Sequence, residues 1–320
     1  MRIRLNSLVV AAAFVAILSF DLGLSARQAG RGQAGGAAAP GQAGQRGGGG
    51  RGGRGGAAAN LPPAGPAPRL SNGKPDLSGH WANPYTPNMA AGRGRGADAV
   101  SNVLDPVTKM PLDWPRKGEK LADAKGAAKT FDLPYTDWGL EQWKAYDPEK
   151  NGDYAGSCYP FGMSRSLNSP HGVQIVASND ALAFLWEQNT WFHWVPLDPN
   201  FKWPKDLPPS WNGISTGHWD GDTLVVVTSG FNGYTRLDTN GHPHSKDAVF
   251  TNTFLRADSR TIQHTYTVHD PKTYTHDWMN VRTWNLKPAG DVIMEYSCEE
   301  NNISLEDGTI TRWHYPDKVD

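Results

Sequence analysis

The sequence lacks several features that would point to a particular class of protein. Lysine plus arginine number 31 and aspartate plus glutamate number 32, so the net charge implies neither an anionic nor a cationic partner. Beyond the N-terminal 26 residues there is no apolar stretch of the roughly 20 residues that a transmembrane helix needs. Internal repeats and a sorting tail are also missing, which argues against a structural or adhesive surface protein.

The one long apolar run lies at the N-terminus. Residues 8–18 are largely apolar, arginines precede them and small residues follow up to Ala26, which is the layout of a secretory signal peptide. We expect residues 1–26 to be removed and the protein to be periplasmic or secreted, with retention as an anchor as the alternative. No cysteine directly follows the run, which argues against a lipoprotein.

Residues 27–69 consist almost entirely of Gly, Ala, Arg, Gln and Pro. Such a segment has too few apolar side chains to offset the entropy of ordering it, so we expect a disordered linker. Its arginines are similar to those of nucleic-acid-binding RGG segments, but the signal peptide directs the chain away from nucleic acid. We therefore expect no nucleic-acid partner.

The remaining residues, 70–320, are predicted to form a single β domain. From residue 171 onward, short alternating or β-branched segments are separated by turn sequences such as Asp220-Gly221. Within residues 261–268, polar residues alternate with a face that carries His264 and Tyr266, so both side chains should point inward. The pattern predicts an all-β, antiparallel up-and-down barrel of the lipocalin-like kind over residues 171–320, with 292–297 as one of its strands.

Residues 70–170 are rich in proline and glycine and are predicted to wrap the barrel irregularly. One short helix is expected over residues 138–146, capped by Thr136 or Asp137. The rest of this region is expected to consist of loops.

Cysteine and tryptophan add two further expectations. Cys158 and Cys298 are the only cysteines, and in an oxidising compartment a pair is most simply a disulfide, with two buried thiols as the alternative. All 13 tryptophans lie at Trp81 or later. Tryptophans of this kind are typical of a well-filled core. Thirteen is more than a core of this size usually needs, so some of them could line a ligand-binding surface.

Two sets of residues carry a resemblance to known proteins. Gly79-His80-Trp81 at the first predicted strand resembles the Gly-x-Trp opening of lipocalin-like barrels. A longer pattern resembles a large family of exported soil-bacterial proteins of unassigned function. That pattern comprises Trp211-Asn212-Gly213-Ile214-Ser215-Thr216-Gly217-His218-Trp219-Asp220-Gly221-Asp222-Thr223-Leu224-Val225-Val226, Gly230-Phe231-Asn232, Pro243-His244-Ser245 and Cys298-Glu299-Glu300-Asn301. The resemblance implies export and the limits of the domain but no activity, and the sequence departs from the pattern near His171 and residues 190–206.

Ten side chains are candidates for binding or catalysis. His218, beside a tight turn, and Glu187, at the end of an apolar strand, are the predicted acid-base residues. The predicted ligand-binding residues are Arg165, Trp186, His193, Trp211, His244, His264, Tyr266 and Tyr274. Structural alternatives stay open: His218 pairs with Trp219, Arg165 caps loop carbonyls, and the inward residues find hydrogen-bond partners in a filled core.

Metal binding and serine hydrolysis are not favoured. His242 and His244 stand two apart, a spacing seen in metal sites, but the sequence places no third ligand beside them. Gly213-x-Ser215-x-Gly217 is similar to a nucleophile motif, yet it lies among strands instead of in a strand-turn-helix. We expect no metal and no other cofactor.

Two functional hypotheses follow. The first is a barrel that binds a small, partly apolar molecule, such as an aromatic compound, a terpenoid or a carbohydrate, in a tryptophan-lined cavity. The second is a cofactor-free lyase, isomerase or hydrolase in which a histidine and a carboxylate act on that molecule. A histidine and a carboxylate that meet in one cavity would favour the second hypothesis, so whether the protein is an enzyme stays open.

Overall fold

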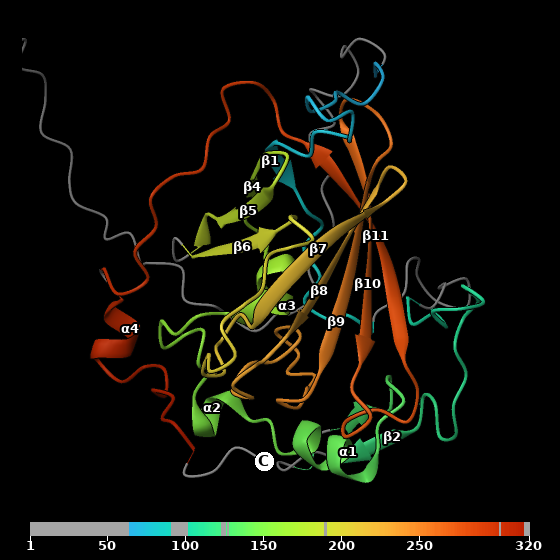
Figure 1. The fold of residues 1–320 in the computed structure, drawn as a ribbon. Helices are drawn as coiled ribbons and strands as arrows, with labels where there is room; N and C mark the ends of the chain where they lie inside the picture. The colour runs from blue at the N-terminus through green and yellow to red at the C-terminus, as the bar shows by residue number, and fades with distance from the viewer. Residues whose placement is uncertain are drawn as a thin grey trace, which may run out of the picture. The chain divides into compact units, whose positions relative to one another are not determined.

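The computed structural model describes residues 64–90, 102–122, 126, 128–188, 191–300 and 302–316 (Figure 1). The predicted signal peptide and residues 27–63 of the predicted linker lie outside the described residues. Contacts with the folded domain begin at Gly65, whose backbone N–H donates to Ser259 Oγ at 3.0 Å. Arg69 follows with an ion pair to Asp222 at 2.6 Å.

Within the described residues, nine antiparallel strands form one curled, nearly closed barrel-shaped sheet. The order across the sheet is β6-β5-β4-β1-β11-β10-β9-β8-β7. Strands that follow one another in the chain therefore pair, except for β6 and β7 at the two ends, and β11 returns to pair with β1 (Figure 1). The predicted all-β, antiparallel up-and-down barrel is confirmed. Its strands are β1 (Gly79–Ala82), β4 (Val173–Ala177), β5 (Ala181–Trp186), β6 (Phe192–Pro196), β7 (Ile214–Asp220), β8 (Thr223–Ser229), β9 (Val249–Arg256), β10 (Thr261–His269) and β11 (Trp278–Leu286).

The backbone ladder stops between β6 and β7, a gap that we call the seam. In an antiparallel sheet each strand runs opposite to the one beside it. Because this sheet has nine strands, its two end strands, β6 and β7, run in the same direction. Parallel neighbours need a crossover of a dozen or more residues, and residues 197–213 supply one. Side chains bridge the seam: His193 Nε2 lies 2.6 Å from Ser215 Oγ, and Trp203 Nε1 donates to Ser215 O at 2.8 Å.

Alternation of side chains explains both the strands and the core. In β10 the residues Ile262, His264, Tyr266 and Val268 are buried, while the residues between them are partly or fully exposed. The inward faces of the sheet carry many large rings, and burying one such ring contributes about 1.5–3 kcal/mol. The fully buried rings on the strands are Trp81, Phe184, Phe250, Phe254, Tyr266, Trp278 and Trp284.

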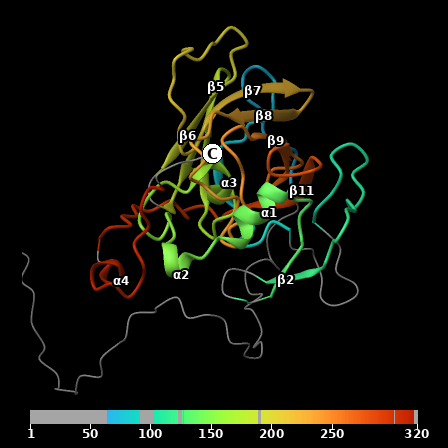
Figure 2. The same ribbon diagram turned by 90° about the horizontal axis from the view of Figure 1, so that it is seen from below.

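The helices precede β4 or follow β11 in the chain. They are α1 (Asp137–Lys144), α2 (Pro148–Asn151), α3 (Gly162–Leu167) and α4 (Ile303–Glu306). The predicted helix at 138–146 is confirmed as α1, and Thr136 Oγ1 accepts from the Gly139 N–H at 3.1 Å. Every residue of α3 is buried, and Figures 1 and 2 both place this helix inside the curve of the sheet.

Three short helices and one hairpin were not predicted from the sequence. The helices α2, α3 and α4 are four to six residues long, too short to show helical periodicity. The hairpin pairs β2 (Lys120–Ala122) with β3 (Ala128–Thr130). The region before residue 170 therefore contains more regular structure than expected.

Residues 292–297 do not form a strand, so this part of the prediction is wrong. β11 runs from Trp278 to Leu286 and has strand partners on both sides, β10 and β1. Residues 292–297 consequently find no edge of β11 to pair with. Val292 and Met294 are 61% and 64% exposed, although their alternation with polar residues is typical of a strand.

The predicted disulfide is present and joins Cys158 to Cys298, with 5.5 Å between the Cα atoms. It ties the segment after β11 to the loop before α3. Nearby rings, which we call the aromatic cluster, pack with centroids 5.0–6.1 Å apart and hold the segment 302–316 on the domain. The cluster consists of Tyr159, Trp211, Tyr234, Trp313 and Tyr315. None of the helices described here is long and apolar enough to cross a membrane.

Candidate functional site

Packed side chains fill the space inside the sheet. His264 and Tyr266 point inward and are fully buried, as their alternation predicted. The His264 ring stacks on Phe254 with centroids 4.7 Å apart and lies 5.0 Å from the Trp284 ring. The hollow that the structure offers to a ligand lies at the edge of this packing, where β5 ends.

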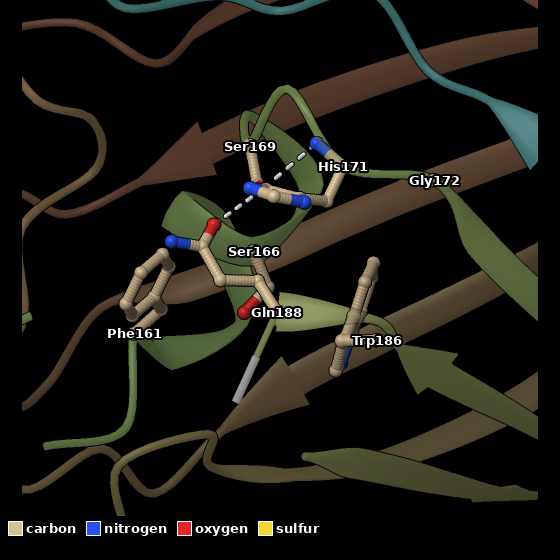
Figure 3. Close-up of a pocket in the computed structure, with 7 residues that line it drawn as sticks. All are labelled: Phe161, Ser166, Ser169, His171, Gly172, Trp186 and Gln188. Carbon is tan, nitrogen blue, oxygen red and sulfur yellow. Dashed lines mark hydrogen bonds between the residues drawn. The ribbon is translucent and has the colours of Figure 1, made fainter. Parts of the chain in front are cut away.

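This shallow hollow opens between α3 and the end of β5, and the space of about 190 Å³ between its lining atoms includes open solvent (Figure 3). Figure 3 shows the rings of Phe161 and Trp186 on opposite sides, with Gln188 between them. The lining residues are Phe161, Ser166, Ser169, His171, Gly172, Trp186 and Gln188. Trp186 is the one predicted ligand-binding residue among them.

Hydrogen bonds fix the polar wall of the hollow. Ser169 Oγ donates to Gln188 Oε1 at 2.8 Å and accepts from the His171 N–H at 3.2 Å (Figure 3). Asn83 Nδ2 donates to Leu167 O at 2.9 Å and to Ser169 O at 3.0 Å. The chain that leaves α3 is thus held on two sides, which preorganises the wall.

A histidine and a carboxylate meet beside the hollow. His171 Nδ1 lies 4.0 Å from Glu187 Oε2, and both side chains are partly exposed. Glu187 Oε1 also accepts from the Met294 N–H at 3.4 Å, and the Tyr296 ring lies 5.9 Å from the His171 ring. Segment 292–297, which the sequence assigned to a strand, therefore borders this pair instead.

The partner of Glu187 is not the predicted one. His218 is exposed on the outer side of β7, where side chains alternate with the buried Ser215. Glu187 directly follows β5, on the opposite side of the seam. Within the described residues the structure does not bring the two predicted catalytic residues together.

His193 lies in a chain of hydrogen bonds at the seam. Its Nε2 is 2.6 Å from Ser215 Oγ, which is 2.6 Å from Thr228 Oγ1. Burial lowers the pKa of His193 to about 4, so the ring is neutral at pH 7. A serine and a neutral histidine in contact are the start of a nucleophilic site, but Ser215 is 1% exposed and has no route to a substrate in this conformation.

His242 has a strongly raised pKa, and no prediction placed this histidine in the site. Its Nδ1 lies 2.6 Å from Asp238 Oδ2, and its Nε2 lies 3.3 Å from both oxygens of Asp132. Burial opposes the charged form, but the two carboxylates outweigh it and raise the pKa of His242 to about 10. Trp143 and Tyr135 stack on the ring at 6.0 and 6.5 Å. The result is an imidazolium held between two carboxylates.

His244 and Tyr274 make internal hydrogen bonds. His244 Nδ1–H donates to Ser245 O at 2.9 Å, so Nε2 accepts from Thr235 Oγ1 at 2.6 Å. Burial lowers the pKa of His244 to about 4. The Tyr274 hydroxyl donates to Pro243 O at 2.6 Å. Both side chains fix the loop before β9.

Arg165 and Trp211 also have structural partners. Arg165 donates from both terminal nitrogens to Asp153, at 2.7 and 2.5 Å, and lies 5.2 Å from the Tyr154 ring. Trp211 belongs to the aromatic cluster and stacks on Tyr159 at 5.5 Å. Neither residue lines the hollow.

The structure adds site residues that sequence reasoning missed. His171 attracted notice only as a departure from the family pattern, and Asp132 and Asp238 carried no motif. Their roles depend on partners more than a dozen residues away, or on a loop that places them, so no local spacing could reveal them. The described residues contain no group of three or more His, Cys, Asp or Glu side chains that could hold a metal ion.

Comparisons of this chain with protein-family models, with curated proteins and with solved structures found no match.

Proposed function

We propose that this protein is an exported barrel that binds a small, partly apolar molecule in the hollow beside Trp186. The observation that carries the proposal is the arrangement of two aromatic walls, Phe161 and Trp186, around a preorganised polar wall. Ligand sites are typically apolar with a few placed polar groups, and this hollow has that composition.

The openness of the hollow limits the size of the bound part. The space of about 190 Å³ between the lining atoms includes open solvent, and it encloses no room for a water molecule in this conformation. A ligand therefore places one ring or a short branched chain against the lining as the side chains move apart, and the rest of the molecule stays in solvent. Gln188 and Ser169 supply hydrogen-bonding groups for a hydroxyl or carbonyl on that ring.

The proposal is tested by calorimetric titration of the mature chain with a panel of plant aromatics, terpenoids and sugars. Gln188→Ala should weaken binding of a ligand found in this way about fivefold to tenfold, the value of one hydrogen bond. Gln263→Ala, on the outer side of β10, is the matched control and should bind normally. Absence of binding by every panel member, or equal losses in both variants, would contradict the proposal.

A second function rests on the pair of His171 and Glu187. A histidine and a carboxylate 4.0 Å apart at the rim are close enough to exchange a proton with a bound molecule through small side-chain movements. In this alternative the protein is a cofactor-free lyase, isomerase or hydrolase. Glu187→Gln should then abolish turnover of a bound panel compound and leave its Kd within about twofold. Loss of binding and turnover together would argue for a purely structural pair.

Export is part of the proposal. The signal-peptide pattern of residues 1–26 and the disulfide between Cys158 and Cys298 both fit an oxidising compartment, and so does the resemblance to exported soil-bacterial proteins. Cell fractionation with mass measurement of the purified chain tests it. A chain recovered from the cytoplasm with residues 1–26 intact would refute it.

A further inference from the structure

Five polar side chains form a buried layer on the inward faces of β9, β10 and β11. We call Asn252, His264, Tyr266, Asn280 and Arg282 the polar layer; each is at most 2% exposed. Tyr266 stands opposite Asn252 on one side and Asn280 on the other, and His264 stands opposite Arg282. Register alone therefore places the five groups together.

Arg282 is the unusual member. Its Nη1 donates to Leu167 O in a long hydrogen bond of 3.4 Å, and its guanidinium carbon lies 5.9 Å from the Tyr266 ring centre. Its Nε and Nη2 are buried and have no hydrogen-bond partner among the described residues. These two nitrogens share one edge of the guanidinium, the fork that pairs with the two oxygens of a planar oxyanion.

Two other buried arginines show how a guanidinium is compensated in this protein. Arg165 donates from both terminal nitrogens to the Asp153 carboxylate, although its Nε also has no hydrogen-bond partner among the described residues. Arg256 donates to four backbone carbonyls, those of Asp76, Ser78, Asp258 and Ser259. Arg282 has neither arrangement. Its charge interacts with Asp238 through space and without a hydrogen bond, Asp238 is already engaged by His242, and burying a charge without a direct partner is costly.

The neighbours of Arg282 offer more unpaired donors than acceptors. His264 Nε2–H donates to Asn252 Oδ1 at 2.8 Å, which leaves Asn252 Nδ2 without a partner in the described chain. The acceptors His264 Nδ1 and Asn280 Oδ1 are also buried without a partner there. Asn280 Nδ2 and the Tyr266 hydroxyl are likewise buried without an aligned hydrogen bond there, although Ser164 lies near Tyr266. Burial and the charge of Arg282 hold the pKa of His264 well below its usual value, so this ring adds no second charge. A positive centre surrounded by amide and hydroxyl donors matches an anion.

We propose that the polar layer binds one small planar oxyanion, a carboxylate group or an ion of the same shape, on the Nε–Nη2 edge of Arg282. This site is separate from the hollow. The end of α3 lies between them, since Leu167 O accepts from Arg282 while Ser169 lines the hollow. Every residue of α3 is buried, so entry requires local opening at the end of this helix, and the packed surroundings restrict the occupant to a few heavy atoms.

The test measures thermal unfolding of the full mature chain in sodium formate, acetate and nitrate, with sodium chloride at equal ionic strength and formamide as the uncharged control. Wild type should show a saturable rise in Tm, roughly 5 °C or more at saturation, in formate and nitrate but not in formamide. Arg282→Met should lose this rise. A response to formate and acetate but not nitrate would assign the site to organic carboxylates, and a response to nitrate as well would assign it to planar oxyanions in general.

Two further variants keep the test decisive if Arg282→Met does not fold. Arg282→Lys keeps the charge but loses the fork, and it should bind formate about tenfold more weakly. Arg256→Lys changes a buried arginine whose donors are already used, and it should keep the full response. Line broadening of carbon-13 formate by each protein reports binding directly. Equal responses in wild type and Arg282→Lys, or a wild-type response no larger than in chloride, would overturn the proposal.

Discussion

The imidazolium of His242 should make the stability of this protein fall as the pH rises above neutrality. The ring lies fully buried between Asp238 and Asp132, and its pKa is raised from 6.5 to about 10. At about 1.36 kcal/mol per pH unit, this rise corresponds to stabilisation of the order of 5 kcal/mol. Such a contribution is a large part of the total stability of a typical domain.

The sign follows from which state holds the proton. Below pH 6.5 the imidazole is protonated in the folded and the unfolded chain, and the full stabilisation is present. Between pH 6.5 and about 10 the unfolded chain loses its proton first, so the contribution falls by about 1.4 kcal/mol per pH unit. Above pH 10 both states are neutral and the contribution is gone.

Urea unfolding of wild type and His242→Gln at intervals from pH 6 to pH 9.5 measures this effect. The difference in free energy of unfolding should be largest near pH 6 and shrink by about 3 kcal/mol between pH 6.5 and 8.5. Taking the difference removes the titration of all other groups. His269→Gln is the control, because His269 pairs with Asp277 on the surface, where an ion pair contributes little. A difference that stays constant across this range would show that His242 is neutral in the folded protein and refute the reasoning.

Three further predictions concern stability. Replacing Cys158 and Cys298 together by serine should lower the free energy of unfolding by up to ~4–5 kcal/mol in urea titrations, because the disulfide closes a loop across a sequence separation of 140 residues; an unchanged midpoint would contradict it. Gly241→Ala should cost about 2–4 kcal/mol in the same assay, since Gly241 has φ +81° and an added Cβ would collide with the Tyr146 ring; a variant as stable as wild type would show that the loop adjusts freely. Burial lowers the pKa of His193 to about 4, so its contribution should be full above pH 6.5 and decline by up to ~3 kcal/mol as the pH falls to 4; a pH slope equal to that of His193→Gln would disprove this.

Local pattern was sufficient for most of the strands. Residues 261–268 alternate strictly, and His264 and Tyr266 do point inward. A two-residue turn connects β7 to β8 as predicted, but its residues are Gly221 and Asp222, one position later than the Asp-Gly pattern indicates, because Asp220 still pairs with Thr223. Gly221 supplies the positive φ, +57°, of this turn. The same kind of alternation gave a wrong strand prediction at 292–297. Alternation shows that a segment can form a strand, but it does not show whether a neighbouring strand has an unpaired edge, and β11 is paired with β10 and with β1.

The candidate site depended on contacts that no pattern encodes. Glu187 was predicted as a catalytic residue, but its partner is His171 and not His218, since the loop after α3 brings His171 to the end of β5. Arg282 has no motif around it, and its orphaned edge is visible only when β9, β10 and α3 are packed together.

The class of fold, most of the strand positions, the inward direction of alternate side chains and the pairing of the two cysteines could be predicted from the sequence. Each of these follows from the periodicity of side chains along a strand, from the residues that favour turns, or from the presence of two cysteines and no more. Tertiary structure alone decided where the hollow opens, which acids surround His242 and which buried arginine lacks a partner. Such properties arise between residues far apart in the chain, where burial and electrostatics depend on every neighbour at once.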